Sequence, residues 1–330
     1  VVHLQFRGSM LSLRRRAGGY HAMWWVAFVA TIPACVHGFY LPGVAPTDYV
    51  KGEELNPKVE ALTSVRTQLP YEYYVLPFCR NGVDLDSQQP LNLGEVLRGS
   101  RIFDTPYKFN MSVDQTCKIL CRKLFDPAEI GAFAEMIDEE YRNHMLLDNL
   151  PIAMSVFHES VDGGESIKAY ETGYPIGHVE GPEVSEEHPE GTTEDAAAKE
   201  KRKLEEASKE RKLYLFNHLR FTILYHEDPT RHGMRIVGFE AEPLSIQHTY
   251  DKEPKWEECV GREAGADGKC SLKTCGADRP ANAPPPDPLV LDKASKAPKE
   301  VVWTYDVQFR LSPIKWSTRW DTYLQSADDA

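Results

Sequence analysis

The sequence predicts a mainly β fold, of the antiparallel β-sandwich type, for most of this 330-residue chain. Two observations predict it: aromatic and β-branched segments of alternating polarity recur along the chain, and only one segment has clear helical spacing. A parallel doubly wound sheet would need helices between most strands, and the sequence lacks them. The expected strands are 71–78, 107–113, 152–158, 213–226, 234–249 and 301–311.

One helix is expected over about 127–147. Asp126 has the character of an N-cap, Pro127 suits the first helical position, and Glu129 completes a capping box. The apolar residues that follow recur at intervals of three and four, which places them on one face of a helix. These residues are Ile130, Phe133, Ile137, Tyr141 and Met145.

The N-terminal segment has the features of a secretory signal peptide. Three arginines at 14–16 precede an apolar run over 23–32, and small residues follow near Gly38. The run is shorter than the roughly 20 residues that a membrane span needs. We expect a leader over 1–38 and a lumenal or extracellular domain over 39–330, with a retained leader as the alternative.

Charge and composition indicate two insertions in this domain. The formal net charge is −12, which gives little support to a nucleic-acid partner. Much of the acidity lies in 180–200, which has eight carboxylates and one lysine. We expect solvated, mobile insertions at about 179–212 and at the Gly-, Pro-, Ala- and Lys-rich stretch 257–300, neither of which buries much apolar surface.

Cysteine usage predicts disulfides. Cys35 lies in the leader, and six cysteines remain in a compartment expected to be oxidising. Cys117 and Cys121 are four residues apart and would share one face of a helix as zinc ligands, but no second ligand pair is evident. Disulfides to Cys79 and Cys259 are favoured, with Cys270 and Cys275 pairing locally.

No motif for catalysis is evident. The sequence has no Gly-x-Ser-x-Gly elbow, no phosphate-binding glycine loop and no His-Glu-x-x-His zinc helix. Asp84-Leu85-Asp86 could hold a divalent cation, but a polar turn is the favoured interpretation. We therefore expect no catalytic residue, no cofactor and no metal.

Two polar features are ambiguous. Asn110 begins an Asn-Met-Ser sequon and is a glycosylation candidate if its side chain points outward. His218, His226, His232 and His248 could form a cluster that senses acidic pH. Scattered surface imidazoles are the favoured interpretation of the four histidines.

An ordered set of motifs resembles the lumenal segment of the transmembrane 9 superfamily, the nonaspanins. The strongest is Trp316-Ser317-Thr318-Arg319-Trp320-Asp321, which in the family stands just before the first transmembrane helix. The two insertions lack counterparts in the family. The other matching motifs are 39–43, 76–79, 92–97, 105–107, 116–118, 148–151, 173–177, 216–218, 225–226, 242–243, 248–249 and 305–307.

The resemblance implies the lumenal part of a multispanning Golgi or endosomal protein that sorts other membrane proteins. It implies no enzymatic activity and no small-molecule substrate for this part. The implied partners are membrane-protein cargo and the protein's own transmembrane domain. Since no segment after residue 32 is long and apolar enough to span a membrane, we expect a fragment or an expressed ectodomain, with a natural secreted form as the alternative.

Aromatic residues near the C-terminus motivate this hypothesis. Trp316 and Trp320 are four residues apart and could share one helical face, so with Arg319 and Asp321 they are the candidate membrane-proximal interface. Trp303 and Tyr305 suit either such an interface or the core.

The alternative hypothesis is a secreted domain that binds carbohydrate or another ligand. It rests on the aromatic cluster of Tyr71, Tyr73 and Tyr74, which could stack on sugar rings, and on the analogy with other β-sandwiches. A glycan array would separate the two hypotheses.

Overall fold

A computed structural model describes residues 45–85, 101–158, 167–181, 211–227, 233–265, 269–276, 279 and 282–321. Nearly all of these residues belong to one compact unit that begins at Pro46. The predicted leader and most of the predicted insertion at 179–212 lie outside the described residues.

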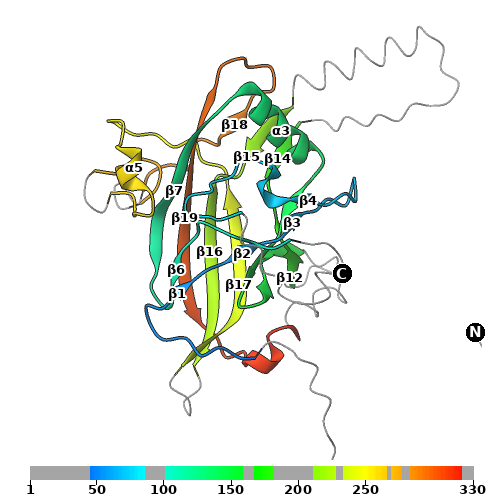
Figure 1. Ribbon diagram of the computed structural model, residues 1–330, viewed down its shortest axis with the longest axis vertical. Helices are drawn as coiled ribbons and strands as arrows, with labels where there is room; N and C mark the ends of the chain where they lie inside the picture. The colour runs from blue at the N-terminus through cyan, green and yellow to red at the C-terminus, as the bar shows by residue number, and fades with distance from the viewer. Residues whose placement is uncertain are drawn as a thin grey trace, which may run out of the picture. The chain divides into compact units, whose positions relative to one another are not determined.

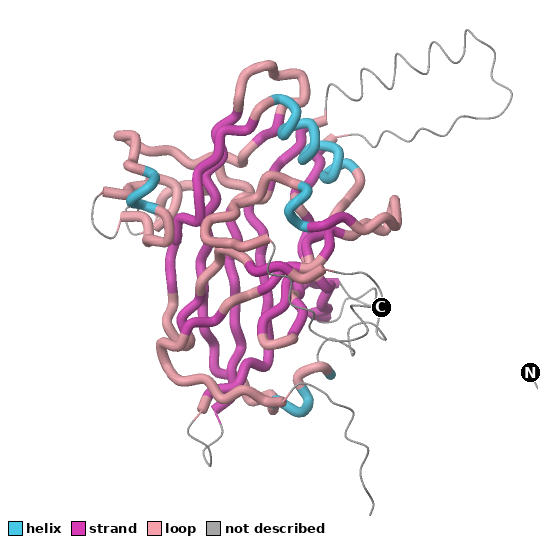
Figure 2. Tube along the Cα trace, viewed as in Figure 1, coloured by secondary structure: helices cyan, strands magenta, loops and turns pink. Residues whose placement is uncertain are grey.

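The unit is built on a six-stranded sheet whose long strands run side by side (Figure 1). The mainly β prediction is confirmed, and strands dominate the trace in Figure 2. The sheet is mixed: β11 pairs with β17 and β16 with β19 in parallel, and the other neighbours are antiparallel. In sheet order the strands are β12 (Ile167–Thr172), β11 (Ala153–His158), β17 (Met234–Leu244), β16 (His218–Glu227), β19 (Lys299–Leu311) and β7 (Gln115–Phe125).

Short strands and one helix form a second layer over one face of this sheet (Figure 1). The helix is α3 (Pro127–Asp138). The short sheets are β1 (Glu54–Leu55) with β6 (Phe109–Asn110); β10 (Leu150–Pro151), β9 (Met145–Leu147), β2 (Lys58–Val59) and β5 (Phe103–Asp104); β3 (Ala61–Leu62) with β4 (Tyr71–Glu72); β13 (Tyr174–Pro175) with β8 (Arg142–Asn143); and β14 (Gly177–Glu180), β15 (Lys212–Leu215) and β18 (Val290–Leu291). The remaining elements are η1 (Tyr73–Val75), α5 (Trp256–Cys259) and η2 (Trp316–Thr318).

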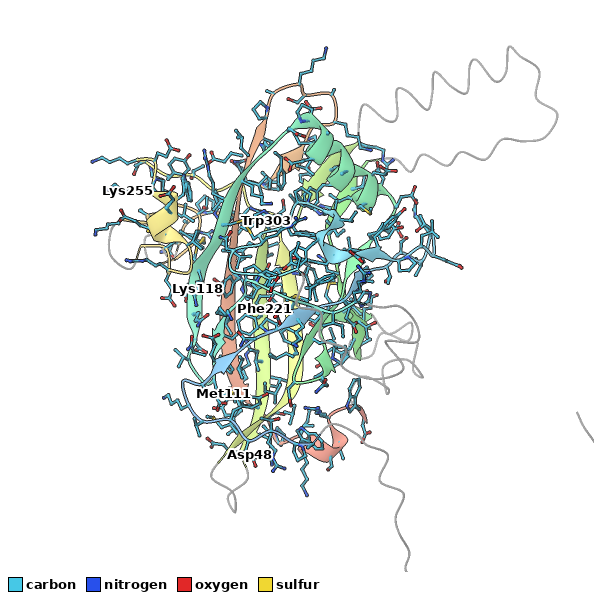
Figure 3. The ribbon with its side chains drawn as sticks, viewed as in Figure 1. Asp48, Met111, Lys118, Phe221, Lys255 and Trp303 are labelled. Atoms are coloured by element: carbon cyan, nitrogen blue, oxygen red, sulfur yellow. A yellow bond between two sulfur atoms is a disulfide. The ribbon has the colours of Figure 1, made fainter. Side chains whose placement is uncertain are left out.

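The core lies between the two layers, and the alternation of β19 explains how. Trp303, Tyr305 and Val307 point into the core, where Phe221 of β16 also lies (Figure 3). Val302, which precedes Trp303, packs in a separate cluster. The aromatic pair Trp303 and Tyr305 therefore belongs to the core, as a period of two along a half-buried strand requires.

Helix α3 begins as predicted and ends earlier. The Asp126 side chain accepts from Glu129 N, and the Glu129 side chain accepts from Asp126 N, so the capping box is confirmed. The predicted extension to residue 147 was wrong, because a Schellman motif ends the helix at Asp138. Glu140 takes the left-handed position with φ 55°, and Tyr141 N donates to Met136 O at 2.9 Å. Since a glutamate stands where glycine is usual, the sequence carried no stop signal.

Four predicted strands are shorter or divided, and one of them, 234–249, ends at Leu244 as β17. The segment 71–78 forms only β4 and η1, and 107–113 contributes only β6. The segment 213–226 breaks between β15 and β16 at Asn217, which is buried. The Asn217 side chain donates to Ile246 O and Val302 O and accepts from Ile246 N, at 2.8 Å each. These bonds satisfy the backbone where the strand is interrupted.

An irregularity in β7 sends Cys117 and Cys121 to different clusters. Trp303 pairs with Cys121 and Thr304 with Ile119, so the register skips one residue of β7. Cys121 lies in the main core, whereas Cys117 and Ile119 face the other side of the sheet. A bulge re-aims side chains in this way, and it explains why these two cysteines do not act as a pair.

The predicted mobile insertion at 257–300 is in part well packed, which corrects that expectation. Its first part, together with Trp256, is called here the disulfide lobe (residues 256–265 and 269–276). Cys259, Cys270 and Leu272 of the lobe are buried against Ile119 and Val302. The lobe also bonds to the free edge of β7, because Ile119 N donates to Arg262 O and Ala264 N to Cys117 O, at 2.9 Å each.

Candidate functional site

A buried ion pair joins the C-terminal motif to the body of the unit. Arg319 Nη1 lies 2.7 Å from Asp148 Oδ2, and the two side chains are 2% and 3% exposed. Arg319 also donates to the carbonyl oxygens of Asp148 and Ile236, at 3.0 Å each. We call Arg319 and Asp148, with the neighbouring Trp316 and Tyr49, the C-terminal clasp.

The β9–β10 hairpin explains how Asp148 is presented to the clasp. Leu147 pairs with Leu150, which leaves Asp148 and Asn149 as a two-residue turn. Their φ angles are 49° and 57°, as in a type I′ turn. Asp and Asn tolerate this left-handed conformation better than other non-glycine residues do, so the local sequence fits the turn.

Two aromatic residues complete the clasp. The Arg319 guanidinium lies 4.6 Å from the centre of the Trp316 ring, in cation–π geometry. The Tyr49 hydroxyl donates to Asp148 Oδ1 at 3.4 Å. Burial and the Asp148 carboxylate raise the pKa of Tyr49 to about 12, so this hydroxyl keeps its proton at physiological pH.

The structure places the four interface candidates in different environments. Arg319 is buried and Trp316 half-buried beneath it, whereas Trp320 is 44% exposed and Asp321 is exposed. The 3₁₀ helix η2 covers only Trp316–Thr318. Sequence reasoning found the segment but missed that Asp148, at a sequence separation of 171, is the partner of Arg319. An interface role for these residues stays a prediction.

All six candidate cysteines form disulfides. Cys79 pairs with Cys121, in line with the partner favoured from the sequence. The other two pairs are Cys117–Cys275 and Cys259–Cys270, so two expectations were wrong: the local Cys270–Cys275 pair, and Cys259 as a partner of Cys117 or Cys121. The lobe folds back on itself, which brings the Cα atoms of Cys259 and Cys270 to 5.5 Å and leaves Cys275 for Cys117.

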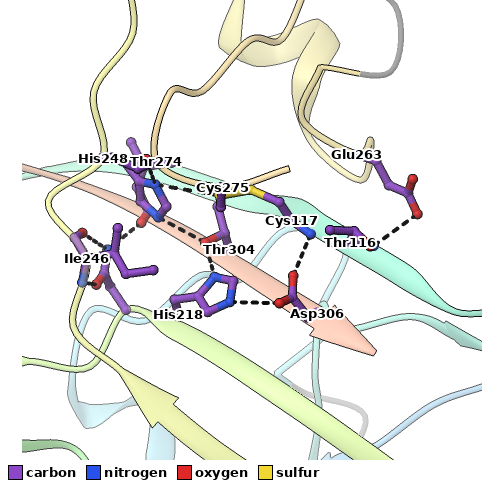
Figure 4. The surroundings of a disulfide bond; sticks show 12 residues. Thr116, Cys117, His218, Ile246, His248, Glu263, Thr274, Cys275, Thr304 and Asp306 are labelled. Atoms are coloured by element: carbon purple, nitrogen blue, oxygen red, sulfur yellow. Dashed lines mark hydrogen bonds and ion pairs between the residues drawn. A yellow bond between two sulfur atoms is a disulfide. The ribbon is translucent and has the colours of Figure 1, made fainter. Parts of the chain in front are cut away.

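A buried polar network lies beside the Cys117–Cys275 disulfide (Figure 4). His218 contacts Asp306 at 3.3 Å and the Thr304 hydroxyl at 2.7 Å. The same hydroxyl is 2.9 Å from His248, which also contacts the Thr274 hydroxyl at 2.7 Å. The favoured interpretation of these two histidines as surface imidazoles was wrong, because both are buried.

The surroundings lower the pKa values of two groups in the network, His248 and Asp306. Burial, with His218 nearby, lowers the pKa of His248 to about 3. Burial alone raises the pKa of Asp306, but hydrogen bonds from His218 and the Cys117 amide, with Arg220 nearby, outweigh it and lower the pKa overall.

Three residues of this region are of types that bind metals. His218, His248 and Cys275 place one potential ligand atom each within 4.8 Å of one another. Cys275 is in a disulfide, and both imidazoles already bond to threonine hydroxyls. The arrangement therefore suits a structural network that fixes the lobe on the sheet better than it suits a metal centre.

The sequon asparagine is engaged with the protein. Asn110 is half-buried in β6. Its Nδ2, the atom that would carry a glycan, donates to Gly52 O at 3.3 Å, and its Oδ1 accepts from Gln115 Nε2 at 2.9 Å. Occupancy of this sequon stays a prediction.

Comparisons with known proteins identify the class. The family model Endomembrane protein 70 matches residues 70–330. Transmembrane 9 superfamily member 8 of Arabidopsis thaliana is 43% identical over 89% of this chain and 39% of its own length. Transmembrane 9 superfamily member 4 of Homo sapiens is 31% identical over 92% of this chain and 41% of its own length.

These matches define a family of membrane proteins, as the resemblance in the sequence predicted. The chain belongs to the Endomembrane protein 70 family, within the transmembrane 9 superfamily. It spans about two fifths of the length of these relatives. Among the residues that the structure describes, no helix is long and apolar enough to cross a bilayer.

Proposed function

We propose that this chain is the lumenal head of a multispanning membrane protein that sorts other membrane proteins in the Golgi and endosomes. In this proposal the head is not an enzyme. It binds the lumenal parts of its cargo and seats on its own transmembrane domain.

The C-terminal clasp is the observation that carries the proposal. It joins the matching motifs 148–151 and 316–321 through one buried ion pair. The pair holds Arg319 in place on the body, because its guanidinium makes three hydrogen bonds and contacts the Trp316 ring. A head that must keep its orientation on a following membrane segment needs such an anchor.

Surface proteomics tests the sorting role. Loss of the full-length protein from cells should lower the surface abundance of a defined set of membrane proteins, and the full-length wild type should restore them. Bulk secretion of soluble proteins is the control and should not change. An unaltered surface proteome in cells without the protein would contradict the proposal.

A second candidate function is ligand binding. Of the three tyrosines named above, Tyr73 and Tyr74 are only 3% and 6% exposed and Tyr71 is 38% exposed, so the three do not form a stacking platform together. A groove of about 990 Å³ instead lies along the outer face of the large sheet, lined by Arg220, Glu242 and Asp306 among others. Its volume is at the upper end of common ligand sites. A glycan array tests this candidate, with Arg220→Ala as the variant expected to lose any saturable signal.

A further inference from the structure

The Cys117–Cys275 disulfide lies against two buried histidines (Figure 4). Cys275 Sγ is 3.8 Å from His248 Nδ1. Cys275, His248 and His218 offer one potential ligand atom each, and these atoms lie within 4.8 Å of one another. Cys117 adds a fourth, because its sulfur is bonded to that of Cys275. Two cysteines and two histidines therefore meet where the disulfide lobe packs on the large sheet.

Backbone hydrogen bonds hold these side chains together independently of the disulfide. Ala264 N of the lobe donates to Cys117 O at 2.9 Å. Lys273 N of the lobe donates to Thr249 O, next to His248, also at 2.9 Å. The lobe is thus bonded both to β7 and to the segment that follows β17. We expect the four side chains to stay close to one another when the bond between the sulfur atoms is opened.

The distances between these atoms are near those of a zinc site. Zinc binds imidazole nitrogen at about 2.1 Å and thiolate sulfur at about 2.3 Å, so tetrahedral geometry places a nitrogen and a sulfur about 3.6 Å apart. The distance from His248 Nδ1 to Cys275 Sγ already has nearly this value. The other ligand atoms need to approach one another by about 1.5 Å at most. The Cα atoms of the two cysteines, 5.6 Å apart, leave room for two separated thiolates.

Asp306 supplies the outer contact that a metal-bound histidine usually has. Its Oδ2 lies 3.3 Å from His218 Nε2, and its Oδ1 accepts from Cys117 N at 2.6 Å. A ligating histidine commonly donates its second ring N–H to a carboxylate, which orients the imidazole. This arrangement leaves His218 Nδ1 for a metal, in place of the Thr304 hydroxyl that now lies 2.7 Å from it. Two thiolates would also cancel the charge of the buried ion.

The Cys117–Cys275 bond is the disulfide that a reductant reaches most easily. Cys275 is 9% exposed, whereas the other five disulfide-bonded cysteines are 0–4% exposed. A thiolate of a small dithiol attacks Cys275 Sγ, the bond between the two sulfurs breaks, and Cys117 leaves as a thiolate. The second thiol of the dithiol then attacks the mixed disulfide and releases Cys275 as a thiolate. The dithiol is oxidised to a disulfide by loss of two electrons, and its two protons pass to water.

We propose that opening the Cys117–Cys275 disulfide creates a zinc site, in which Cys117, Cys275, His218 and His248 bind one Zn²⁺. While the disulfide is closed, the same residues form the structural network described above. The ion replaces the disulfide as the link between the lobe and the sheet. This inference does not depend on the sorting role, which the surface proteome tests separately.

Cobalt binding tests the site in the full chain with Cys35→Ser. The protein is treated under nitrogen with dithiothreitol, at a concentration at which alkylation and mass spectrometry detect only Cys117 and Cys275 as free thiols. The dithiol is removed, and Co²⁺ is titrated in as a spectroscopic substitute for Zn²⁺. His248→Gln is the test variant. The matched control is His226→Gln, which removes an imidazole outside the cluster.

The opened protein should bind one Co²⁺ per chain, with the visible bands of tetrahedral coordination and thiolate-to-cobalt charge-transfer absorption. The closed protein should bind none, and one equivalent of Zn²⁺ should abolish the bands. His248→Gln should lower the affinity at least about a hundredfold, since loss of an outer contact alone typically costs about 10- to 100-fold. His226→Gln should leave the affinity unchanged.

Three results would overturn the proposal. The first is opened protein without thiolate-bound cobalt, or closed protein that binds it equally well; this result needs no variant and holds even if His248→Gln does not fold. The second is equal affinity in folded His248→Gln, since other ligands would then hold the metal. The third is opening of the Cys79–Cys121 or Cys259–Cys270 disulfide before Cys117–Cys275.

Discussion

Asp148 has two functions in the clasp: its backbone adopts the left-handed turn, and its carboxylate neutralises a buried guanidinium. Asn is as tolerant of that turn as Asp. The change Asp148→Asn therefore keeps the backbone and removes only the charge, which isolates the ion pair.

Asp148→Asn should lower the free energy of unfolding by about 3–5 kcal/mol, because it leaves the Arg319 guanidinium buried without a counter-charge. Denaturant unfolding of the full chain measures this. Glu54→Gln, which removes an exposed pair with Lys108, is the control and should cost at most about 1 kcal/mol. Equal losses for the two variants would refute the clasp as a specific anchor.

His248 gives a prediction about pH. Its folded pKa is about 3, below its ordinary value of 6.5. The unfolded chain therefore binds a proton that the folded chain does not, so stability is lost as the pH falls below about 6.5 and continues to fall toward 3. Between pH 7 and pH 5 the loss from this group should be about 2 kcal/mol.

The comparison that isolates His248 is His248→Gln, which has no titrating group. Unfolding curves of the wild type and the variant at both pH values give the difference in pH dependence, because carboxylates contribute equally to the two proteins. If both proteins lose the same stability, the buried imidazole is not the cause.

At the scale of elements, Glu140 shows both what a sequence predicts and what it conceals. The capping box at Asp126 could be predicted from the sequence, because its residue types are those that such caps require. The end of α3 could not be predicted, because a glutamate occupies the left-handed position where glycine is usual. Tertiary contacts compensate for the cost of this left-handed conformation, since Arg66 pairs with Glu140 at 2.8 Å and the Ser64 hydroxyl donates to Glu139 O.

Glu140→Gly should therefore be more stable than Glu140→Ala by about 1 kcal/mol, because only glycine adopts this conformation without steric cost. Both changes remove the pair with Arg66, so the comparison reports the backbone alone. Thermal unfolding of the two variants decides it, and equal midpoints would show that the helix end is not strained.

The same distinction holds for the large sheet: features set by neighbouring residues could be predicted, and features set by residues far apart in the chain could not. The alternation of 301–311 left Trp303 and Tyr305 open between an interface and the core, and the structure places both side chains in the core. The parallel neighbours of β19 and β11, the pairing of Cys117 with Cys275 and the clasp all depend on segments far apart in the chain. One sequence without aligned relatives holds no signal for such contacts.

The disulfide lobe gives the second prediction at this scale. Cys117→Ser with Cys275→Ser should free the lobe from the sheet while the main core remains, because Cys117 and Cys275 lie in the outer cluster. Hydrogen exchange should become faster at Ala264 N, which bonds to Cys117 O, and stay slow at the amides of β16. Unchanged protection at Ala264 would mean that the buried histidine network alone holds the lobe.

At the scale of the whole molecule, the family follows from ordered motifs that the fold brings together. The turn at 148–149 and the motif at 316–321 meet in the clasp, and His218 and Asp306 meet in the network beside the disulfide.

The central claim is that this head faces the lumen of the secretory pathway, and an added glycan tests it most directly. Val65→Asn places a sequon ahead of Arg66-Thr67 at a position that is 80% exposed. In the full-length protein, this variant should gain an N-linked glycan that becomes resistant to endoglycosidase H as the protein passes the Golgi. A variant that receives no glycan at this position would contradict the account.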